Sequence, residues 1–443
     1  MKIQLSDHFT YQRLLHFCLP SIIMMIFTSI YGVVDGLFVS NFVGKIPFAA
    51  INLVMPFIMI LGGFGFMIGT GGSALIAKTL GEGRHKLANR YFSMLIIMTV
   101  ILGLILTTIG IVFARRVSIL LGATDVMLDD CVIYLRTVLL FISPFMLQNV
   151  FQSFLVTAQK PHAGLIVTII AGLTNMSLDA LFIVVFRWGV AGAALATGIS
   201  QCIGGLLPLV LFLGKNDSLL HLVPTRLEWR PFFLSCTNGM SELMGNISSS
   251  IVSMLYNFQL LNYAGENGIA AYGVLMYVQF IFIAIFFGYT IGVGPVIGYH
   301  YGAGNHAELK NLLRKSLKLN IIAGISMTIL ANLFAGTLSR IFVGYDPELY
   351  AMTKSAFHIF ALSFLVCGIN IFASAFFTAL NNGLVSAVIS FLRTLVFQVG
   401  SVLILPAFLG LTGIWLSNTF ADLMAMLISI IFLTALRKRY HYA

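Results

Sequence analysis

"LGEGRHK", residues 80–86, and "YGAGNHA", residues 301–307, align when the chain is laid on itself at an offset of 221 residues. In this register two glycines and a histidine of the first segment fall on two glycines and a histidine of the second. The same offset brings "GVAG" (189–192) onto "GLTG" (410–413) without a gap. One register kept over such a distance indicates an internal repeat of about half the chain.

Composition predicts where this repeat folds. Of the 443 residues, 59% are hydrophobic and 9% are charged, whereas soluble domains carry about 25% charged residues. About 20 apolar residues form a helix long enough to cross the ~30 Å hydrocarbon core, and only helices and closed barrels satisfy their backbone there. The long apolar runs lack the alternation of a barrel strand. We therefore expect an all-α integral membrane protein.

Twelve transmembrane helices are expected, six in each copy of the repeat. They are predicted over residues 15–38, 49–77, 91–113, 131–158, 162–185, 190–213, 232–263, 268–299, 316–338, 352–379, 384–405 and 411–436. Because six is even, both halves enter the membrane in the same direction, as in the parallel repeats of secondary transporters. We expect an N-lobe (1–213), a cytoplasmic linker (214–231) and a C-lobe (232–443).

The net charge of +10 does not indicate nucleic-acid binding, because the lysines and arginines lie in short loops rather than on one soluble face. Most of them lie on the side of the N-terminus, which places both termini in the cytoplasm. The first apolar run contains Pro20 and lacks an A-x-A site, so we expect a retained helix. A compact chain without long tails favours a prokaryotic plasma (inner) membrane.

"NMSLDALFI", residues 175–183, places polar side chains inside an apolar run. Asn175 and Asp179 are four residues apart and share one helical face. An ionised aspartate at the bilayer centre costs at least ~2.5 kcal/mol, so it needs a polar cavity or a partner. Asp35 and Thr197, from the first and sixth helices, can lie beside them in a six-helix bundle.

These four side chains offer hard oxygen ligands, which suit an alkali cation. Desolvation and a second nearby carboxylate also favour a bound proton. The residues alone leave both ions open, and a purely structural alternative is that Asp179 hydrogen-bonds Asn175 or the backbone to fix packing.

Four motifs carry a family resemblance: "YGVVDGLFVS" (31–40), "AQKP" (158–161), "NMSLDALFI" (175–183) and "GVAGAALAT" (189–197). With the two six-helix halves, they make the chain resemble the multidrug and toxic compound extrusion (MATE) transporters over essentially its full length. The resemblance implies a V-shaped pair of lobes around a central cleft. It also implies export of organic, often cationic, amphipathic compounds in exchange for H⁺ or Na⁺.

The resemblance also assigns a cation-coupling site in the N-lobe. Its members match Asp35, Asn175, Asp179 and Thr197 here, and a sodium ion would bind the first three. The family's asparagine of helix 4 is matched most nearly by spacing with Gln152, and Asn149 lies close by. Besides H⁺ or Na⁺, no cofactor is expected.

The C-lobe lacks these acids at the repeat-related positions, where Asp179 falls on Gly400 and Asp35 on Tyr256. It has three charged candidates of its own, Glu242, Arg393 and Asp422. Arg393 and Asp422 lie near the middle of adjacent helices and are predicted to form a buried ion pair, with Glu242 as a competing partner. Such a pair serves packing or the recognition of cationic substrates.

Apolar and aromatic residues are expected to line the cleft, because adaptable apolar walls suit varied amphipathic ligands. The candidates are Met55, Phe57, Met276, Tyr277, Phe280, Phe282 and Phe286.

The sequence thus predicts a secondary active multidrug antiporter, acting as a monomer on small organic cations in contact with membrane lipid. The alternative is a flippase for lipid-linked sugars or lipids, but its cleft would need more buried basic residues than Arg393. An enzyme is not expected, because Walker A, H-E-x-x-H and G-x-S-x-G motifs are absent. Neither zinc spacing nor a C-x-x-C pair occurs among the five cysteines.

Overall fold

The computed structural model describes residues 3–214 and 217–442, and these residues are almost entirely helical. The N-lobe contains α1 (Tyr11–Phe38), η1 (Val39–Val43), α2 (Lys45–Gly81), α3 (His85–Leu120), α4 (Leu128–Leu139), α5 (Ile142–Thr157), α6 (Pro161–Asp179), η2 (Ala180–Val185) and α7 (Gly189–Leu213). The C-lobe contains α8 (Trp229–Asn238), α9 (Met240–Gly302), α10 (His306–Val343), α11 (Pro347–Phe360), η3 (Ala361–Ser363), α12 (Phe364–Ala379), α13 (Gly383–Phe391), η4 (Leu392–Phe397), α14 (Gln398–Leu409), α15 (Leu411–Ala435) and α16 (Arg437–Tyr440).

The described helices account for the twelve predicted spans. Ten of them are long and apolar enough to cross a membrane, and α4 with α5 forms a further span bent by 57°. One of the ten, α9, is divided at Gly265, whose φ of 63° and ψ of −152° are not helical and suit glycine. Its two arms are two spans, so the all-α fold with twelve transmembrane helices is confirmed.

Some predicted helices are interrupted in the structure. Helix 131–158 breaks at residues 140–141, between the end of α4 at Leu139 and the start of α5 at Ile142. Pro144 then lies in the first turn of α5, where the N–H that proline lacks would have no partner within the helix. Helix 352–379 contains the 3₁₀ segment η3, and helix 384–405 contains the π-helical segment η4.

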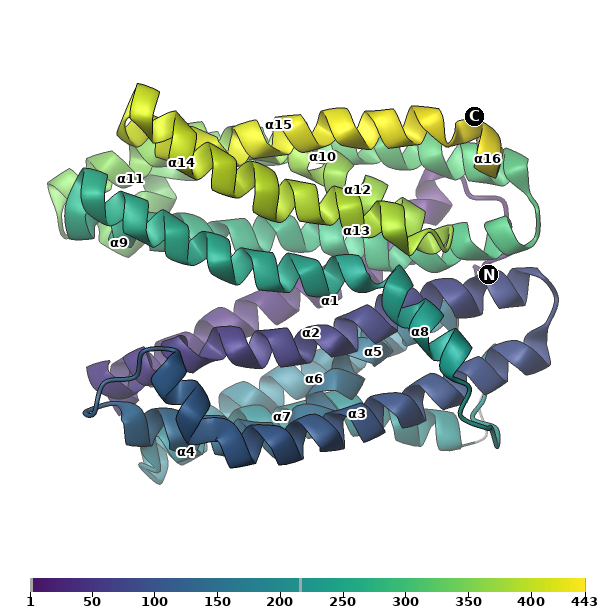
Figure 1. The fold of residues 1–443 in the computed structure, drawn as a ribbon, viewed down its shortest axis with the longest axis horizontal. Helices are drawn as coiled ribbons and strands as arrows, with labels where there is room; N and C mark the ends of the chain where they lie inside the picture. Colours follow the sequence, from purple (N-terminus) through teal and green to yellow (C-terminus); the bar gives the residue numbers. More distant parts are fainter. Residues whose placement is uncertain (1–2, 215–216, 443) are drawn as a thin grey trace.

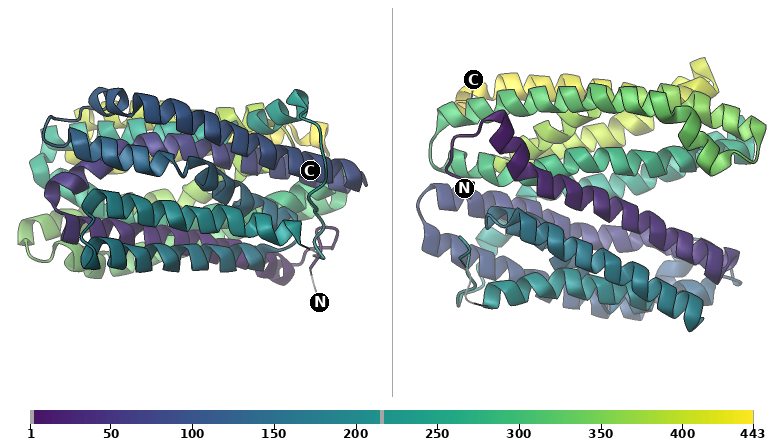
Figure 2. Two further views of the ribbon diagram at one scale, coloured as in Figure 1. Left: turned by 90° about the horizontal axis from the view of Figure 1, so that it is seen from below. Right: turned by 180° about the vertical axis from the view of Figure 1, so that it is seen from behind.

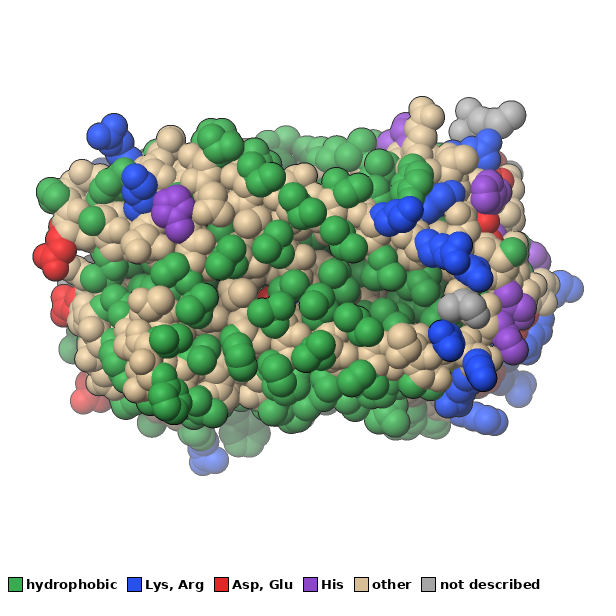
Figure 3. Space-filling view, turned by 90° about the horizontal axis from the view of Figure 1, so that it is seen from above, with side chains coloured by type: hydrophobic (Ala, Val, Ile, Leu, Met, Phe, Trp, Pro, Cys, Tyr) green, Lys and Arg blue, Asp and Glu red, His purple; other side chains and the backbone are tan. Residues whose placement is uncertain are grey.

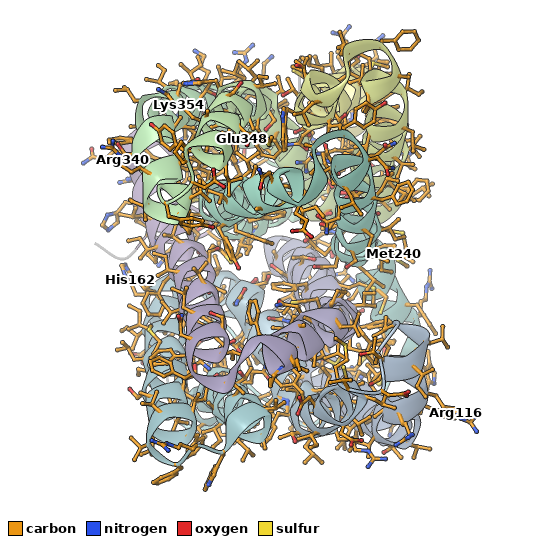
Figure 4. The ribbon with its side chains drawn as sticks, turned by 90° about the vertical axis from the view of Figure 1, so that its left-hand side faces the viewer. Arg116, His162, Met240, Arg340, Glu348 and Lys354 are labelled. Atoms are coloured by element: carbon orange, nitrogen blue, oxygen red, sulfur yellow. The ribbon has the colours of Figure 1, made fainter. Side chains whose placement is uncertain are left out.

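The two lobes form two layers that lie close together at the end of the molecule where both termini are found (Figure 1). The view from behind shows α1 crossing toward the C-lobe at that end, while the layers diverge toward the other end (Figure 2). The lobes therefore form a V, as the resemblance implies. Figure 4 looks onto the diverging end, where Arg340, Glu348 and Lys354 belong to the C-lobe and Arg116 belongs to the N-lobe.

The surface fits a membrane protein. Hydrophobic side chains cover the middle of the face shown in Figure 3, whereas lysines and arginines gather toward the end that carries the termini. Apolar side chains in the middle and basic side chains at one end match a bilayer core flanked by a headgroup layer.

Repeated glycines make the contact between the lobes. A Cβ atom on Gly81 would lie 2.0 Å from the carbonyl oxygen of Tyr299, and a Cβ on Gly302 would lie 2.0 Å from that of Lys78. Gly81 and Gly302 are partners under the 221-residue offset, so the two copies of the motif pack reciprocally. Only glycine permits backbones to approach this closely.

The N-terminal segment closes the same end. Glu308 of α10 accepts hydrogen bonds from the Phe9 amide at 2.9 Å and pairs with His8 Nδ1 at 2.6 Å. Lys315 Nζ donates to the Phe9 carbonyl oxygen at 2.6 Å. These contacts tie the N-terminal segment of the N-lobe to the C-lobe.

We expect Gly302→Val to destabilise the protein by about 1–3 kcal/mol or more, because its side chain must displace the backbone of α2. Gly294→Val is the matched control in the same helix, since a Cβ there meets nothing within 4 Å. Thermal unfolding in detergent measures both. An equal loss of stability in the two variants would contradict this account of the lobe contact.

Candidate functional site

Two aspartates face each other inside the N-lobe. Asp35 lies in the last turn of α1 and Asp179 is the last residue of α6. Asp179 is fully buried, and the two carboxyl groups are close enough to share a proton. Among the described residues, no hydrogen-bond donor reaches Asp35 Oδ1 or either carboxylate oxygen of Asp179.

Further oxygen atoms without partners belong to the same part of the bundle. Asn175 Oδ1 lies one turn before Asp179 on α6, and Thr197 Oγ1 and Gln201 Oε1 lie one turn apart on α7. All are buried atoms with no hydrogen-bond partner in the described part of the chain. Buried polar atoms are rarely left unpaired, and such a group of them points to an ion or water.

Helix packing brings the acids together. A Cβ atom on Gly172 of α6 would lie 2.5 Å from Phe27 and 2.9 Å from Tyr31, both on α1. Because Gly172 has no side chain, α1 can approach α6 closely at Tyr31, one turn before Asp35. Both helices then continue as π-helical segments, η1 and η2, which are frequent at functional sites.

Two tyrosines complete the surroundings. The hydroxyl of Tyr134 on α4 lies toward Thr197 and within electrostatic range of both aspartates. The hydroxyl of Tyr31 interacts with Gln148 of α5 and lies near Asp35. Both tyrosines can donate hydrogen bonds, whereas no lysine or arginine forms an ion pair with either aspartate among the described residues.

The structure thus brings Asp35 and Asp179 together, with Asn175 and Thr197 on adjoining turns and helices. Gln152 is 5% exposed on α5, and its Oε1 is a further buried oxygen with no partner within the described chain. One turn earlier on α5, Gln148 is the glutamine linked to the acidic pair, through Tyr31.

The sequence prediction missed Tyr31, Tyr134, Gln148 and Gln201. Helical spacing offered a signal for two of them, because Tyr31 lies four residues before Asp35 and Gln201 lies four residues after Thr197. Tyr134 and Gln148 reach the site across helix contacts, for which a single sequence gives no signal.

The C-lobe contains the predicted ion pair. Arg393 Nε donates to Asp422 Oδ1 at 2.7 Å, and the side chains are 13% and 1% exposed. Asn370 Nδ2 donates to the Asp422 carbonyl oxygen at 2.8 Å. Glu242 forms no ion pair in the described residues and lies near the contact of α9 with α2, beside Leu243, which approaches Gly63.

The internal repeat relates the two charged clusters. Asp422 falls on Gln201 and Tyr256 falls on Asp35 at the 221-residue offset, and Tyr256 is within electrostatic range of Asp422. The C-lobe thus contains a guanidinium where the N-lobe has none. In the C-lobe cluster Arg393 neutralises Asp422, whereas the N-lobe pair of acids has no cation beside it among the described residues.

The predicted cleft residues have different surroundings. Tyr277 and Phe280 are 41% and 64% exposed, whereas Phe286 is 1% exposed in the C-lobe core, so Phe286 is not a wall of the cleft. The Phe280 carbonyl oxygen accepts a hydrogen bond from Ser29 of α1 at 3.4 Å. Met55, Phe57, Met276 and Phe282 are partly buried against the cores of their lobes.

Beyond the contact between Ser29 and Phe280, α1 and α9 separate. A Cβ atom on Gly32, Gly36 or Gly273 would meet nothing within 4 Å. The acidic pair therefore lies in the half of the molecule where the lobes diverge.

The MatE family model matches the chain twice, over residues 20–181 and 243–404. The chain belongs to the MatE family. The two matches lie in the two halves, as the internal repeat predicts.

Relatives and solved structures agree with the family. The multidrug export protein MepA of Staphylococcus haemolyticus is 26% identical over 436 residues, 97% of this chain and 94% of that protein. MepA of Staphylococcus aureus (strain MSSA476) is 25% identical over 437 residues, with the same coverage. An outward-facing multidrug resistance MATE family transporter has the same fold, with a TM-score of 0.91 at 22% identity, covering 97% of this chain and 98% of that one. This MatE protein is therefore a multi-pass membrane protein of a transporter family whose members are in general not enzymes.

We expect Arg393→Ala and Asp422→Ala each to destabilise the C-lobe by about 3–5 kcal/mol, because each strands a buried charge. The double variant is expected to lose much less than the sum of the two. Unfolding measured on wild type, both single variants and the double variant gives the coupling energy. Additive losses would show that the ion pair contributes no coupling.

Proposed function

We propose that this MatE protein is a secondary active transporter that exports organic, mostly cationic, amphipathic compounds in exchange for H⁺ or Na⁺. The observation that carries the proposal is the pair of facing carboxyl groups, Asp35 and Asp179, with no cationic partner among the residues that the structure describes. The MepA relatives are named multidrug export proteins, which supports the class of substrate.

The coupling step follows from electrostatics. Two carboxylates removed from water repel each other, so a bound proton or a sodium ion stabilises the pair. Asp35, Asp179 and Asn175 supply oxygen ligands for sodium, and Thr197 adds a hydroxyl. Because these groups lie on α1, α6 and α7, occupancy of the site changes how these helices pack. The π-helical segments beside both aspartates are where such a change is most easily absorbed.

The substrate is proposed to bind between the lobes. We assign Tyr277 and Phe280 to this site because both aromatic side chains are exposed and aromatic rings attract organic cations. Met55 and Met276 would add adaptable apolar surface. Glu242 supplies a negative charge that forms no ion pair within the described parts of the chain. The unpaired Oδ2 of Asp422 offers a second acceptor beside Arg393.

We propose a monomer in the plasma (inner) membrane, with both termini in the cytoplasm, in contact with membrane lipid and with no nucleic-acid partner. A lipid-linked sugar flippase is the second candidate, but the cleft candidates include only Arg393 to hold a pyrophosphate.

The test is efflux of ethidium from proteoliposomes under an imposed proton gradient or an imposed sodium gradient. We expect one gradient to accelerate efflux by wild type, and Asp35→Asn and Asp179→Asn to reduce the driven rate by about tenfold or more, since each removes a coupling charge while keeping the shape. Asp125→Asn, which alters an exposed aspartate, is the control and is expected to behave as wild type.

Full gradient-driven efflux by Asp35→Asn would refute the coupling role of the pair. If wild type moves no ethidium under either gradient, the multidrug proposal fails for this cation and the flippase proposal gains support.

A further inference from the structure

The segment that connects the two lobes is ordered along the outside of the N-lobe (Figure 1). The Val223 amide donates to Ser93 Oγ of α3 at 2.9 Å, and the His221 amide donates to Asn89 Oδ1 of α3 at 3.1 Å. Residues 217–228 are therefore attached to α3 rather than free in the cytoplasm.

This attachment builds a groove. The groove has a volume of about 430 Å³ and lies between α3, α7 and the connecting segment, with an almost entirely apolar lining. Its residues are Ser93, Ile96, Ile97, Val100, Ile101, Leu209, Leu222, Val223 and Pro224. Ile97 and Ile101 are 42% and 39% exposed, so the groove is open to the hydrocarbon that surrounds α3.

The rim of the groove is basic. A second hollow, lined by Arg90, Pro224, Thr225 and Arg226, adjoins the first at Pro224. Arg90 pairs with Glu228 at 2.9 Å while its side chain stays 43% exposed. The Arg226 side chain has no hydrogen bond or ion pair among the residues that the structure describes.

Neighbouring aromatic residues indicate how deep in the membrane this basic rim lies. Trp229 and Phe233 are 62% and 59% exposed and their rings stack at 6.1 Å. Exposed tryptophan concentrates at the level of lipid headgroups. Arg226 lies three residues before Trp229, and Arg90 lies in the second turn of α3, which then continues into the membrane. The basic rim is therefore at headgroup depth and the apolar groove extends below it.

We propose that this groove binds one anionic phospholipid, with its phosphate between Arg90 and Arg226 and an acyl chain along α3 and α7. Guanidinium groups bind phosphate oxygens with paired, charge-assisted hydrogen bonds, and Arg226 has these donors free. The positive rim disfavours the cationic substrates proposed for the cleft. Because the lipid contacts both α3 and the segment that leads to the C-lobe, it holds this connecting segment against α3.

The experiment is native mass spectrometry of the purified full chain, titrated separately with palmitoyl-oleoyl phosphatidylglycerol and palmitoyl-oleoyl phosphatidylcholine. Wild type is expected to bind one phosphatidylglycerol about tenfold more tightly than phosphatidylcholine. A hydrogen bond to a charged group contributes about a factor of ten or more in affinity. Arg226→Gln is expected to remove this preference and leave phosphatidylcholine binding unchanged.

Two further variants keep the test specific. Lys438→Gln removes one positive charge from an exposed side chain of α16 in the other lobe and is expected to keep the preference. Ile97→Trp fills the groove and is expected to weaken binding of both lipids. Equal affinity of wild type for the two lipids, or equal effects of Arg226→Gln and Lys438→Gln, would overturn the proposal.

Discussion

Two carboxyl groups held against each other inside an apolar bundle are the constraint on which the N-lobe depends. Asp35 and Asp179 have carboxylate oxygens that no donor of the described chain satisfies, and leaving such atoms unpaired away from water is costly. The glycine at 172 allows α1 and α6 to bring them together. The proposed proton or sodium ion would compensate these unpaired oxygens. Because its ligands lie on α1, α6 and α7, occupancy of the site can change how these three helices pack.

The internal repeat explains why only one lobe is proposed to respond to an ion. Gly81 and Gly302 show that the two halves share their scaffold and meet through equivalent contacts. Their charged interiors differ, because Arg393 supplies a permanent cation to Asp422. An arginine cannot leave its site or lose its proton, so the C-lobe cluster is fixed while the N-lobe cluster can be filled and emptied.

Sequence patterns predicted the parts of this structure that depend on composition and spacing. The 221-residue offset predicted two halves, hydropathy predicted twelve spans, and the charged residues within apolar runs predicted the pair of Arg393 and Asp422. The assignment of Gln152 rested on spacing alone, whereas the contact of Gln148, one helical turn earlier, with Tyr31 depends on how α5 packs against α1. The π-helical segments and the docking of residues 217–228 on α3 depend on contacts between distant helices, which hydropathy does not encode.

The most direct test of ion exchange at the Asp35 and Asp179 pair is to count the ions released when a substrate cation binds. Ethidium is added to purified protein in weakly buffered detergent solution, while a pH indicator and a sodium electrode follow the two candidate ions. We expect wild type to release about one monovalent cation, H⁺ or Na⁺, per bound ethidium, because exchange takes place at a single carboxyl pair. We expect Asp35→Asn to release none. Ethidium binding to wild type with release of neither ion, or equal release by Asp35→Asn, would contradict this expectation.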